Sequence, residues 1–141
     1  MSKRNSVSIV EAFWREVWQG KNPEAADRLV AEDFAITSGG TVIGPRETFK
    51  QWVGAFLTSI DDFNFEIVEM FQNEAGDRVA TRWAVTGKNN GVMGAEPCGS
   101  PIYMTGTAVI HVREDGLLQH NWVERNALEV HRSLLKRAEA S

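Results

Sequence analysis

The chain has little cysteine, no long apolar run and no excess of basic residues. Its 141 residues include a single cysteine, Cys98, which excludes an internal disulfide and favours a reducing compartment. No apolar run approaches the length of a membrane span, and the residues after Lys3 and Arg4 are amphipathic rather than continuously apolar as in a signal peptide. We therefore expect a cytoplasmic protein that does not bind membranes.

The charge balance and the histidine spacing exclude further classes. With 19 acidic and 15 scattered basic residues, the chain lacks the basic surface by which proteins bind nucleic acid. The three histidines lack metal-site spacing: His111 and His120 could approach each other across a hairpin, but a third ligand would have to be Glu124 from the same strand. We expect no metal site and no nucleic-acid partner.

What the chain does have is an ordinary apolar content of 43% and five tryptophans, which is many for this length. A chain of this size is long enough to bury a real core. We expect one domain over residues 1–141.

The first part of the chain shows helical spacing. Apolar residues predict a helix over Ser6 to Gln19, and a short second helix is expected after Pro23. A small hairpin is expected over Phe34 to Ser38 and Thr41 to Ile43. Pro45 then opens a helix with a continuous apolar stripe, formed by Phe49, Trp52, Val53, Phe56, Leu57 and Ile60.

The later part alternates as strands do, over Phe63 to Phe71, Arg78 to Gly87, Ile102 to Arg113 and Leu117 to Asn126. A last helix is predicted over Ala127 to Ala138. Early helices and long late strands favour an α+β domain with about three to four helices on one face of a strongly curved antiparallel sheet. The Gly- and Asn-rich segment Lys88 to Pro101 is long enough to be a lid or rim.

The last two strands are joined by Asp115-Gly116, a strong signal for a two-residue turn. This turn would pair Arg113 with Leu118, His111 with His120 and Thr107 with Glu124. One face would then collect polar groups, which are costly to bury outside a functional pocket; they are His111, His120, Trp122, Glu124 and Asn126. We interpret this face as the pocket wall.

The order of elements and several short motifs resemble the SnoaL-like polyketide cyclases, within the NTF2-like superfamily that includes ketosteroid isomerase and scytalone dehydratase. The motifs are Arg82-Trp83, then Thr86-Gly87-Lys88-Asn89-Asn90-Gly91, then Gly94 to Gly99, then Asp115-Gly116 followed by Trp122 and Asn126. The resemblance covers nearly the whole chain. It implies a cone-shaped (cystatin-like) domain that encloses a pocket, often for acid–base chemistry without metal or organic cofactor.

In those cyclases an aspartate commonly follows the strand tryptophan by four residues and acts as the general acid or base. Here that position holds Asn126, and an amide does not exchange a proton near neutral pH. Asn126 would instead hold a ligand oxygen, or cap the last helix.

His111 and Glu124 are the remaining candidates for moving a proton. Imidazole titrates near neutral pH, and a carboxyl beside Trp122 would be partly desolvated. Alternatively His111 is bonded to His120, and Glu124 is solvated or paired with Arg82 or Arg125. We name His111, Glu124 and Asn126 as the candidate catalytic residues.

Six aromatic side chains are expected to bind a planar ligand or, alternatively, to fill the core or anchor a strand; they are Trp14, Trp52, Phe56, Trp83, Tyr103 and Trp122. The resulting hypothesis is a cofactor-independent cyclase, isomerase, dehydratase or hydrolase that acts on a hydrophobic aromatic or polycyclic small molecule. The alternatives are a ligand-binding protein of the same fold and a dimeric assembly module. A homodimer is expected from the resemblance.

Overall fold

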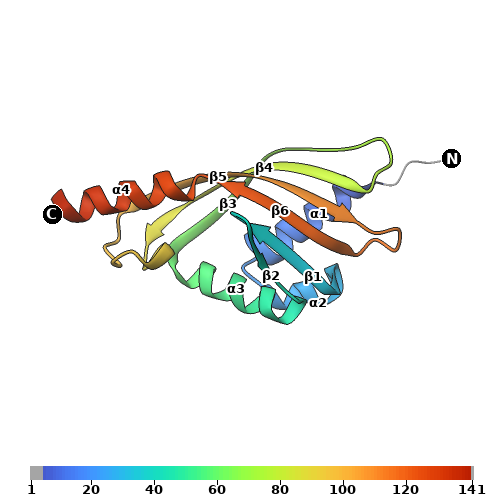
Figure 1. Cartoon of the computed structure of the whole chain (residues 1–141), viewed down its shortest axis with the longest axis horizontal. Coiled ribbons are helices and arrows are strands. Elements are labelled where there is room, and N and C mark those ends of the chain that lie inside the picture. The colour runs from blue at the N-terminus through green and yellow to red at the C-terminus, as the bar shows by residue number, and fades with distance from the viewer. Residues whose placement is uncertain (1–4, 141) are drawn as a thin grey trace.

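A computed structural model describes the backbone of residues 5–140 and the side chains of residues 5–137. Within this range the chain forms four α-helices and one six-stranded sheet, and α4 (Ala127–Ala140) runs outward from the end of the last strand (Figure 1). The predicted α+β class is confirmed. The expectation of no signal peptide concerns the N-terminal residues, of which 1–4 lie outside the described residues.

The first predicted helix has the expected extent but two geometries. It is α-helical as α1 (Ser6–Phe13), where the Asn5 side chain accepts a hydrogen bond from the Ser8 N–H, and it continues as a π-helix over Trp14–Gln19. The Gly20 N–H donates to the carbonyl of Arg15 at 2.8 Å, a five-residue step. Such π segments are wider than α-helices and often occur at functional sites.

A 3₁₀ turn (Pro23–Ala25) and α2 (Ala26–Leu29) form the expected short second helix. The predicted apolar stripe then appears on α3 (Arg46–Thr58), except that Ile60 belongs to β3 (Ile60–Gln72). The helix lies against β3 and against β1 (Val30–Ser38). Phe49 and Val53 are fully buried there, whereas Trp52 and Phe56 are half-buried. The inner edge of α3 therefore fills the core, and its neighbouring positions remain partly open.

The strands follow the order β2-β1-β6-β5-β4-β3. Their bounds are β1 Val30–Ser38, β2 Thr41–Ile43, β3 Ile60–Gln72, β4 Arg78–Asn89, β5 Pro101–Val112 and β6 Leu118–Arg125. The expectation of a wholly antiparallel sheet is wrong, because β1 and β6 pair in parallel and the sheet is mixed. Turn signals reveal only pairs of strands that follow each other closely, and most of the chain separates these two.

The predicted hairpin register is confirmed at His111 with His120 and at Thr107 with Glu124. The expected Arg113–Leu118 pair is not formed, because a bulge shifts the register and places Leu118 opposite Val112. At the turn, the Asp115 carboxylate accepts a hydrogen bond from the Leu117 N–H at 3.1 Å. The bulge lies beside the turn, so the faces of β6 beyond His120 follow the expected alternation.

The two faces of the sheet differ in what covers them. Inward residues of the central strands are buried against α1, the π-helix and α3, and they include Val79, Thr81, Trp83, Val85, Met104, Ala108 and Ile110. On the outer face large side chains remain exposed, such as Tyr103, Val109 and Trp122. The helices therefore enclose one face only.

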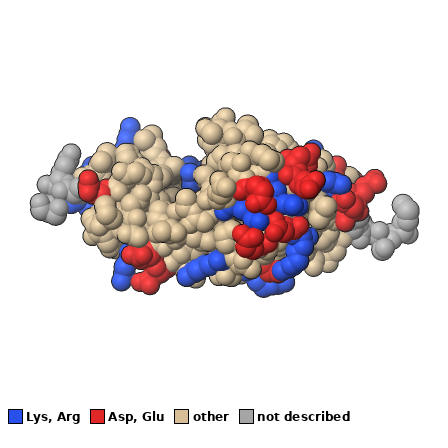
Figure 2. Space-filling model, turned by 90° about the horizontal axis from the view of Figure 1, so that it is seen from below, with Lys and Arg blue, Asp and Glu red and all other residues tan. Residues whose placement is uncertain are grey.

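Acidic and basic side chains are interleaved over the helical side of the molecule rather than gathered by sign (Figure 2). Lys50 of α3 illustrates this, since its ammonium lies 2.9 Å from carboxylates of both Glu24 and Asp27. These contacts raise the pKa of Lys50 above its ordinary value, the hydrogen bond to Glu24 contributing most. Within the described residues, none of the helices has the length and apolar character needed to cross a membrane.

Candidate functional site

An interior cavity lies between the helices and the inner face of the sheet. Its void space, including the part of the mouth that is open to solvent, is about 380 Å³. The π-helix, α3, and the strands β1, β3, β4 and β6 contribute the walls, which consist of Trp14, Trp18, Ile36, Ser38, Trp52, Phe56, Phe65, Trp83, Val85, Asn121, Val123 and Arg125.

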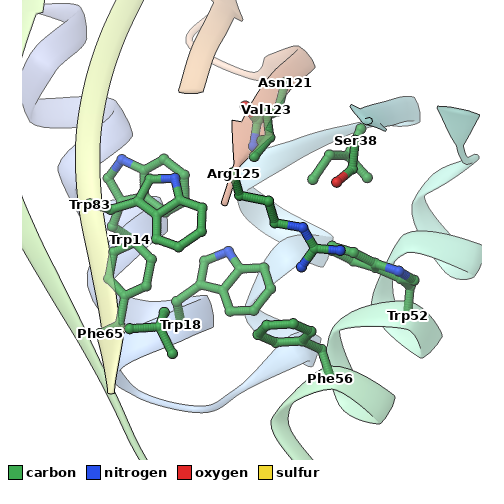
Figure 3. A pocket seen from close by; sticks show the side chains of 12 residues that line it. Trp14, Trp18, Ser38, Trp52, Phe56, Phe65, Trp83, Asn121, Val123 and Arg125 are labelled. Atoms are coloured by element: carbon green, nitrogen blue, oxygen red, sulfur yellow. The ribbon is translucent and has the colours of Figure 1, made fainter. Parts of the chain in front are cut away.

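Aromatic residues make up half of the lining residues, and their rings contact one another (Figure 3). Phe65 stacks against Trp14 with ring centroids 5.1 Å apart and against Trp83 at 5.8 Å. Trp18 meets Phe56 edge-on at 5.8 Å. Because Trp14 and Trp18 both belong to the π-helix, that segment directs two indoles into one wall. Such a surface suits a flat apolar ligand.

Arg125 is the single ionisable side chain among the described residues that line this cavity. Its guanidinium carbon lies 5.4 Å from the ring centroid of Phe56 and 5.9 Å from that of Trp52. Figure 3 shows the side chain reaching from the end of β6 between Trp18 and Trp52. Burial lowers the pKa of Arg125 below its ordinary value, although a guanidinium stays protonated in proteins.

The partners of Arg125 are weak. It makes cation–π contacts with Trp52 and Phe56, and its Nη1 lies 4.0 Å from the sulfur of Met104. Among the described residues, no carboxylate forms an ion pair with it. A half-buried cation without a counter-ion is costly, so the cavity contains an unbalanced positive charge.

Three other polar atoms of the wall are buried without a hydrogen-bond partner in the described structure: Trp18 Nε1, Trp83 Nε1 and Asn121 Oδ1. Asn121 is only 1% exposed, and both indoles are 7% exposed. Trp14 provides a contrast, because its Nε1–H donates to the Thr81 hydroxyl at 3.1 Å. Buried polar atoms are nearly always paired, so these three indicate a place for a polar ligand or water.

The expected pocket wall on the last hairpin is wrong, because it lies on the other face of β6. Asn121, Val123 and Arg125 point into the cavity, whereas Trp122 is 42% exposed and Glu124 is exposed on the outer face. The register is as predicted, but the side was misjudged. In a sheet covered on one face, the strand side richer in polar groups is the solvent side.

The three candidate catalytic residues therefore lie outside the cavity. His111 is half-buried on the outer face, opposite Arg78 and His120. The Asn126 side chain accepts a hydrogen bond from the Thr105 N–H at 3.0 Å, which ties the start of α4 to β5. Glu124 and Asn126 border a separate, more open groove on the outer face together with Tyr103. A catalytic role for these residues stays a prediction.

Four of the six predicted aromatic residues line the cavity, namely Trp14, Trp52, Phe56 and Trp83. Tyr103, which is 64% exposed, and Trp122 lie on the outer face instead. Sequence reasoning missed Trp18, Phe65, Asn121 and Arg125. The signal for the last two was available, since Asn121 and Arg125 flank the apolar Val123 at every second position of β6.

The loop between β4 and β5 is held together by Asn89, whose side chain is almost fully buried. Its Oδ1 accepts hydrogen bonds from the N–H groups of Gly91 and Val92, and its Nδ2 donates to the carbonyl of Glu96 at 2.6 Å. In the same loop a hydrogen bond from Ser100 lowers the pKa of exposed Cys98 to about 7. The cavity walls are made by other segments, so a role for this loop as a lid stays a prediction.

Comparison with known proteins relates the chain to one family. A family model described as SnoaL-like polyketide cyclase matches residues 8–134. No curated protein sequence matches the chain.

Within the described residues there is no group of three His, Cys, Asp or Glu side chains that could hold a metal ion.

Three solved structures illustrate the likeness. A proposed polyketide cyclase from Acidithiobacillus ferrooxidans is 25% identical, with a TM-score of 0.80 over 96% of this chain and 99% of its own. A proposed SnoaL-like polyketide cyclase from Jannaschia sp. CCS1 is 13% identical, with a TM-score of 0.84 over 95% and 96%. AclR from Streptomyces galilaeus, proposed as a hydroxylase, is 18% identical, with a TM-score of 0.80 over 96% and 98%. The fold is thus shared by proteins with different proposed activities.

Proposed function

The chain belongs to the SnoaL-like polyketide cyclase family, and we propose that it is a cofactor-independent enzyme that binds a hydrophobic, ring-bearing small molecule such as a polyketide in its interior cavity. The observation that carries this proposal is the aromatic wall around a single cation, Arg125. The wall would hold a flat substrate, and the cation would stabilise negative charge that develops on a substrate oxygen.

Ring closure is the reaction that this arrangement supports best. A carbon next to a carbonyl would lose a proton, add to a second carbonyl carbon of the same molecule, and leave a hydroxyl after the oxygen takes up a proton. Confinement of both reacting carbons against the aromatic wall of the cavity would supply proximity. Since the cavity walls carry no carboxylate or imidazole among the described residues, water at the mouth would exchange the protons.

The lack of a carboxylate or imidazole among the described residues of the cavity wall also supports an alternative, a non-catalytic protein that binds the same kind of ligand. The two functions are separated by incubating the purified protein, with a chelator present, with a panel of aromatic β-polyketones and analysing products by chromatography and mass spectrometry. Catalysis predicts a product equal in mass to its substrate, or lighter by one water, at a rate that Trp52→Leu reduces at least about 10-fold.

Saturable binding of these molecules without any product would support the binding protein instead. Failure of every ring-bearing molecule to bind would overturn both functions. Arg82→Met is the matched control, because Arg82 lies on the outer face and pairs with Glu69 at 2.6 Å.

We also propose the expected homodimer, formed through the outer face of the sheet. Val109 and Trp122 are exposed side by side in register there, and Tyr103 lies further along β5. Trp122→Glu should convert a dimer to a monomer in light-scattering measurements while leaving ligand binding unchanged. A wild-type protein that is monomeric at micromolar concentration would contradict this proposal.

A further inference from the structure

The polar atoms inside the cavity describe its ligand more closely than the apolar wall does. Arg125 supplies a positive charge, Trp18 an N–H donor and Asn121 a carbonyl acceptor, and the two neutral groups are buried without partners. A purely apolar ligand would leave all of them unsatisfied. Water could bond to the neutral atoms but would not balance the charge.

The positions of these groups also indicate how far apart the polar groups of a ligand would lie. Asn121 and Arg125 stand four residues apart on the same side of β6, which is about 13 Å of strand. The guanidinium of Arg125 lies over Phe56 and Trp52, and both of these rings contact the Trp18 indole, so the cation and this indole belong to one part of the cavity (Figure 3). The cation and the amide acceptor therefore contact different parts of a ligand.

The surrounding rings define the shape between those points. Trp18 and Phe65 are stacked at 6.2 Å, and Phe65 and Trp83 at 5.8 Å, so the wall is a series of nearly parallel rings. Such a wall accepts a flat molecule of two or more fused rings better than a flexible chain.

We propose that the ligand is a flat fused-ring molecule with an ionised oxygen group, a carboxylate or an acidic enol, bound by Arg125 and the Trp18 N–H, and with a hydroxyl donor bound by Asn121 Oδ1. This inference rests on the proposed function, because it assigns the chemistry of the same cavity. It adds a charge and a direction to the bound molecule.

The test uses calorimetry with 6-hydroxy-2-naphthoate as the probe. Its uncharged amide, 6-hydroxy-2-naphthamide, should bind the wild-type protein at least about 10-fold more weakly, as expected for a hydrogen-bonded charge. Arg125→Met should remove this preference, so that both probes bind within about 2-fold of each other. Arg82→Met should keep the preference.

The hydroxyl contact is tested in the same way with 2-naphthoate, which lacks the hydroxyl. Wild-type protein should bind it about 5-fold more weakly than the hydroxylated probe, and Asn121→Leu should abolish the difference. The thermal midpoints of Asn121→Leu and Arg125→Met, measured without ligand, show that each variant is folded. A difference that persists in Asn121→Leu would overturn the assignment of the hydroxyl.

A second pair of probes, 4-hydroxycoumarin and 4-methoxycoumarin, distinguishes a carboxylate site from a site that also accepts an ionised enol. A preference for the ionised member in both pairs supports a site for any conjugated oxyanion, and a preference in the naphthalene pair alone supports a carboxylate. Equal binding of charged and uncharged probes by the wild-type protein would overturn this inference while leaving the proposed aromatic site intact. Absence of binding by all probes would overturn both.

Discussion

Trp83 and Gly106 lie directly opposite each other in the β4–β5 ladder, and the indole of Trp83 occupies the space that a side chain at position 106 would fill. A Cβ built on Gly106 would come within 2.2 Å of the Trp83 ring. This glycine therefore allows the tryptophan to lie across β5 and form the far wall of the cavity.

Gly106→Ala should destabilise the protein by about 1–3 kcal/mol, because the added methyl group forces the indole out of its place. Chemical denaturation measures this change. Gly54→Ala is the matched control, since a Cβ added at this position in the middle of α3 would have no atom within 4 Å, and it should stabilise the protein by about 0.5–1 kcal/mol. Equal effects of the two substitutions would contradict the close approach.

Arg125→Met should leave the thermal midpoint unchanged or raise it by roughly 2–4 °C. The substitution keeps an unbranched side chain and removes a desolvated charge that lacks a counter-ion, a change that is often neutral or stabilising. Scanning calorimetry without ligand checks this. A drop of several degrees would mean that the guanidinium stabilises the fold, and that the charge is not reserved for a ligand.

Singly, His111→Asn and Glu124→Gln should change the affinity for 6-hydroxy-2-naphthoate by less than about 2-fold, because neither residue lines the cavity. Trp52→Leu should weaken the same binding about 10-fold. If either outer-face substitution abolished turnover of a substrate while affinity was kept, the assignment of catalysis to these residues would be restored.

Stability should fall as the pH is lowered through 6.5. Burial, and then the positive charge of nearby His111, lower the pKa of His120 below its ordinary value of 6.5. As the pH falls, the unfolded chain therefore binds a proton at this position before the folded protein does. The free energy of unfolding decreases until the pH reaches the pKa of His120 in the folded protein. Thr37 and Trp122 contact the same ring, and Arg78 lies over Trp122.

Urea denaturation at pH 7.5 and 5.5 measures this loss, and His120→Gln should lose less stability across that interval than the wild-type protein. His131→Gln, on α4, is the control and should behave like the wild type. Identical losses in wild type and His120→Gln would contradict a depressed pKa at His120.

Local patterns in the sequence were enough to predict most helices and strands. The stripe that includes Phe49 and Val53 marked α3, and Asp115-Gly116 fixed the register of His111 with His120. The sequence did not reveal which side of that hairpin faces inward, since this depends on where the helices pack. Polar character pointed to the wrong side, because the outer side of β6 carries His120 and Glu124 and faces solvent.

Two further features depend on contacts between distant segments. The parallel pairing of β1 with β6 follows from no turn signal. The π-helix that directs Trp14 and Trp18 into one wall has the same apolar spacing as an ordinary helix, so its five-residue hydrogen bonds could not be predicted.

The parallel pairing of β1 with β6 also has a consequence during synthesis. Ile36 meets Asn121, and Ser38 meets Val123, only after residues 118–125 have left the ribosome. Until then the indoles of Trp14 and Trp18 lack the part of the wall that β6 provides, and the nascent chain would expose this open side to chaperones and to aggregation. Completion of the binding site therefore waits for β6, and a stalled chain ending before residue 118 should fail to reach it.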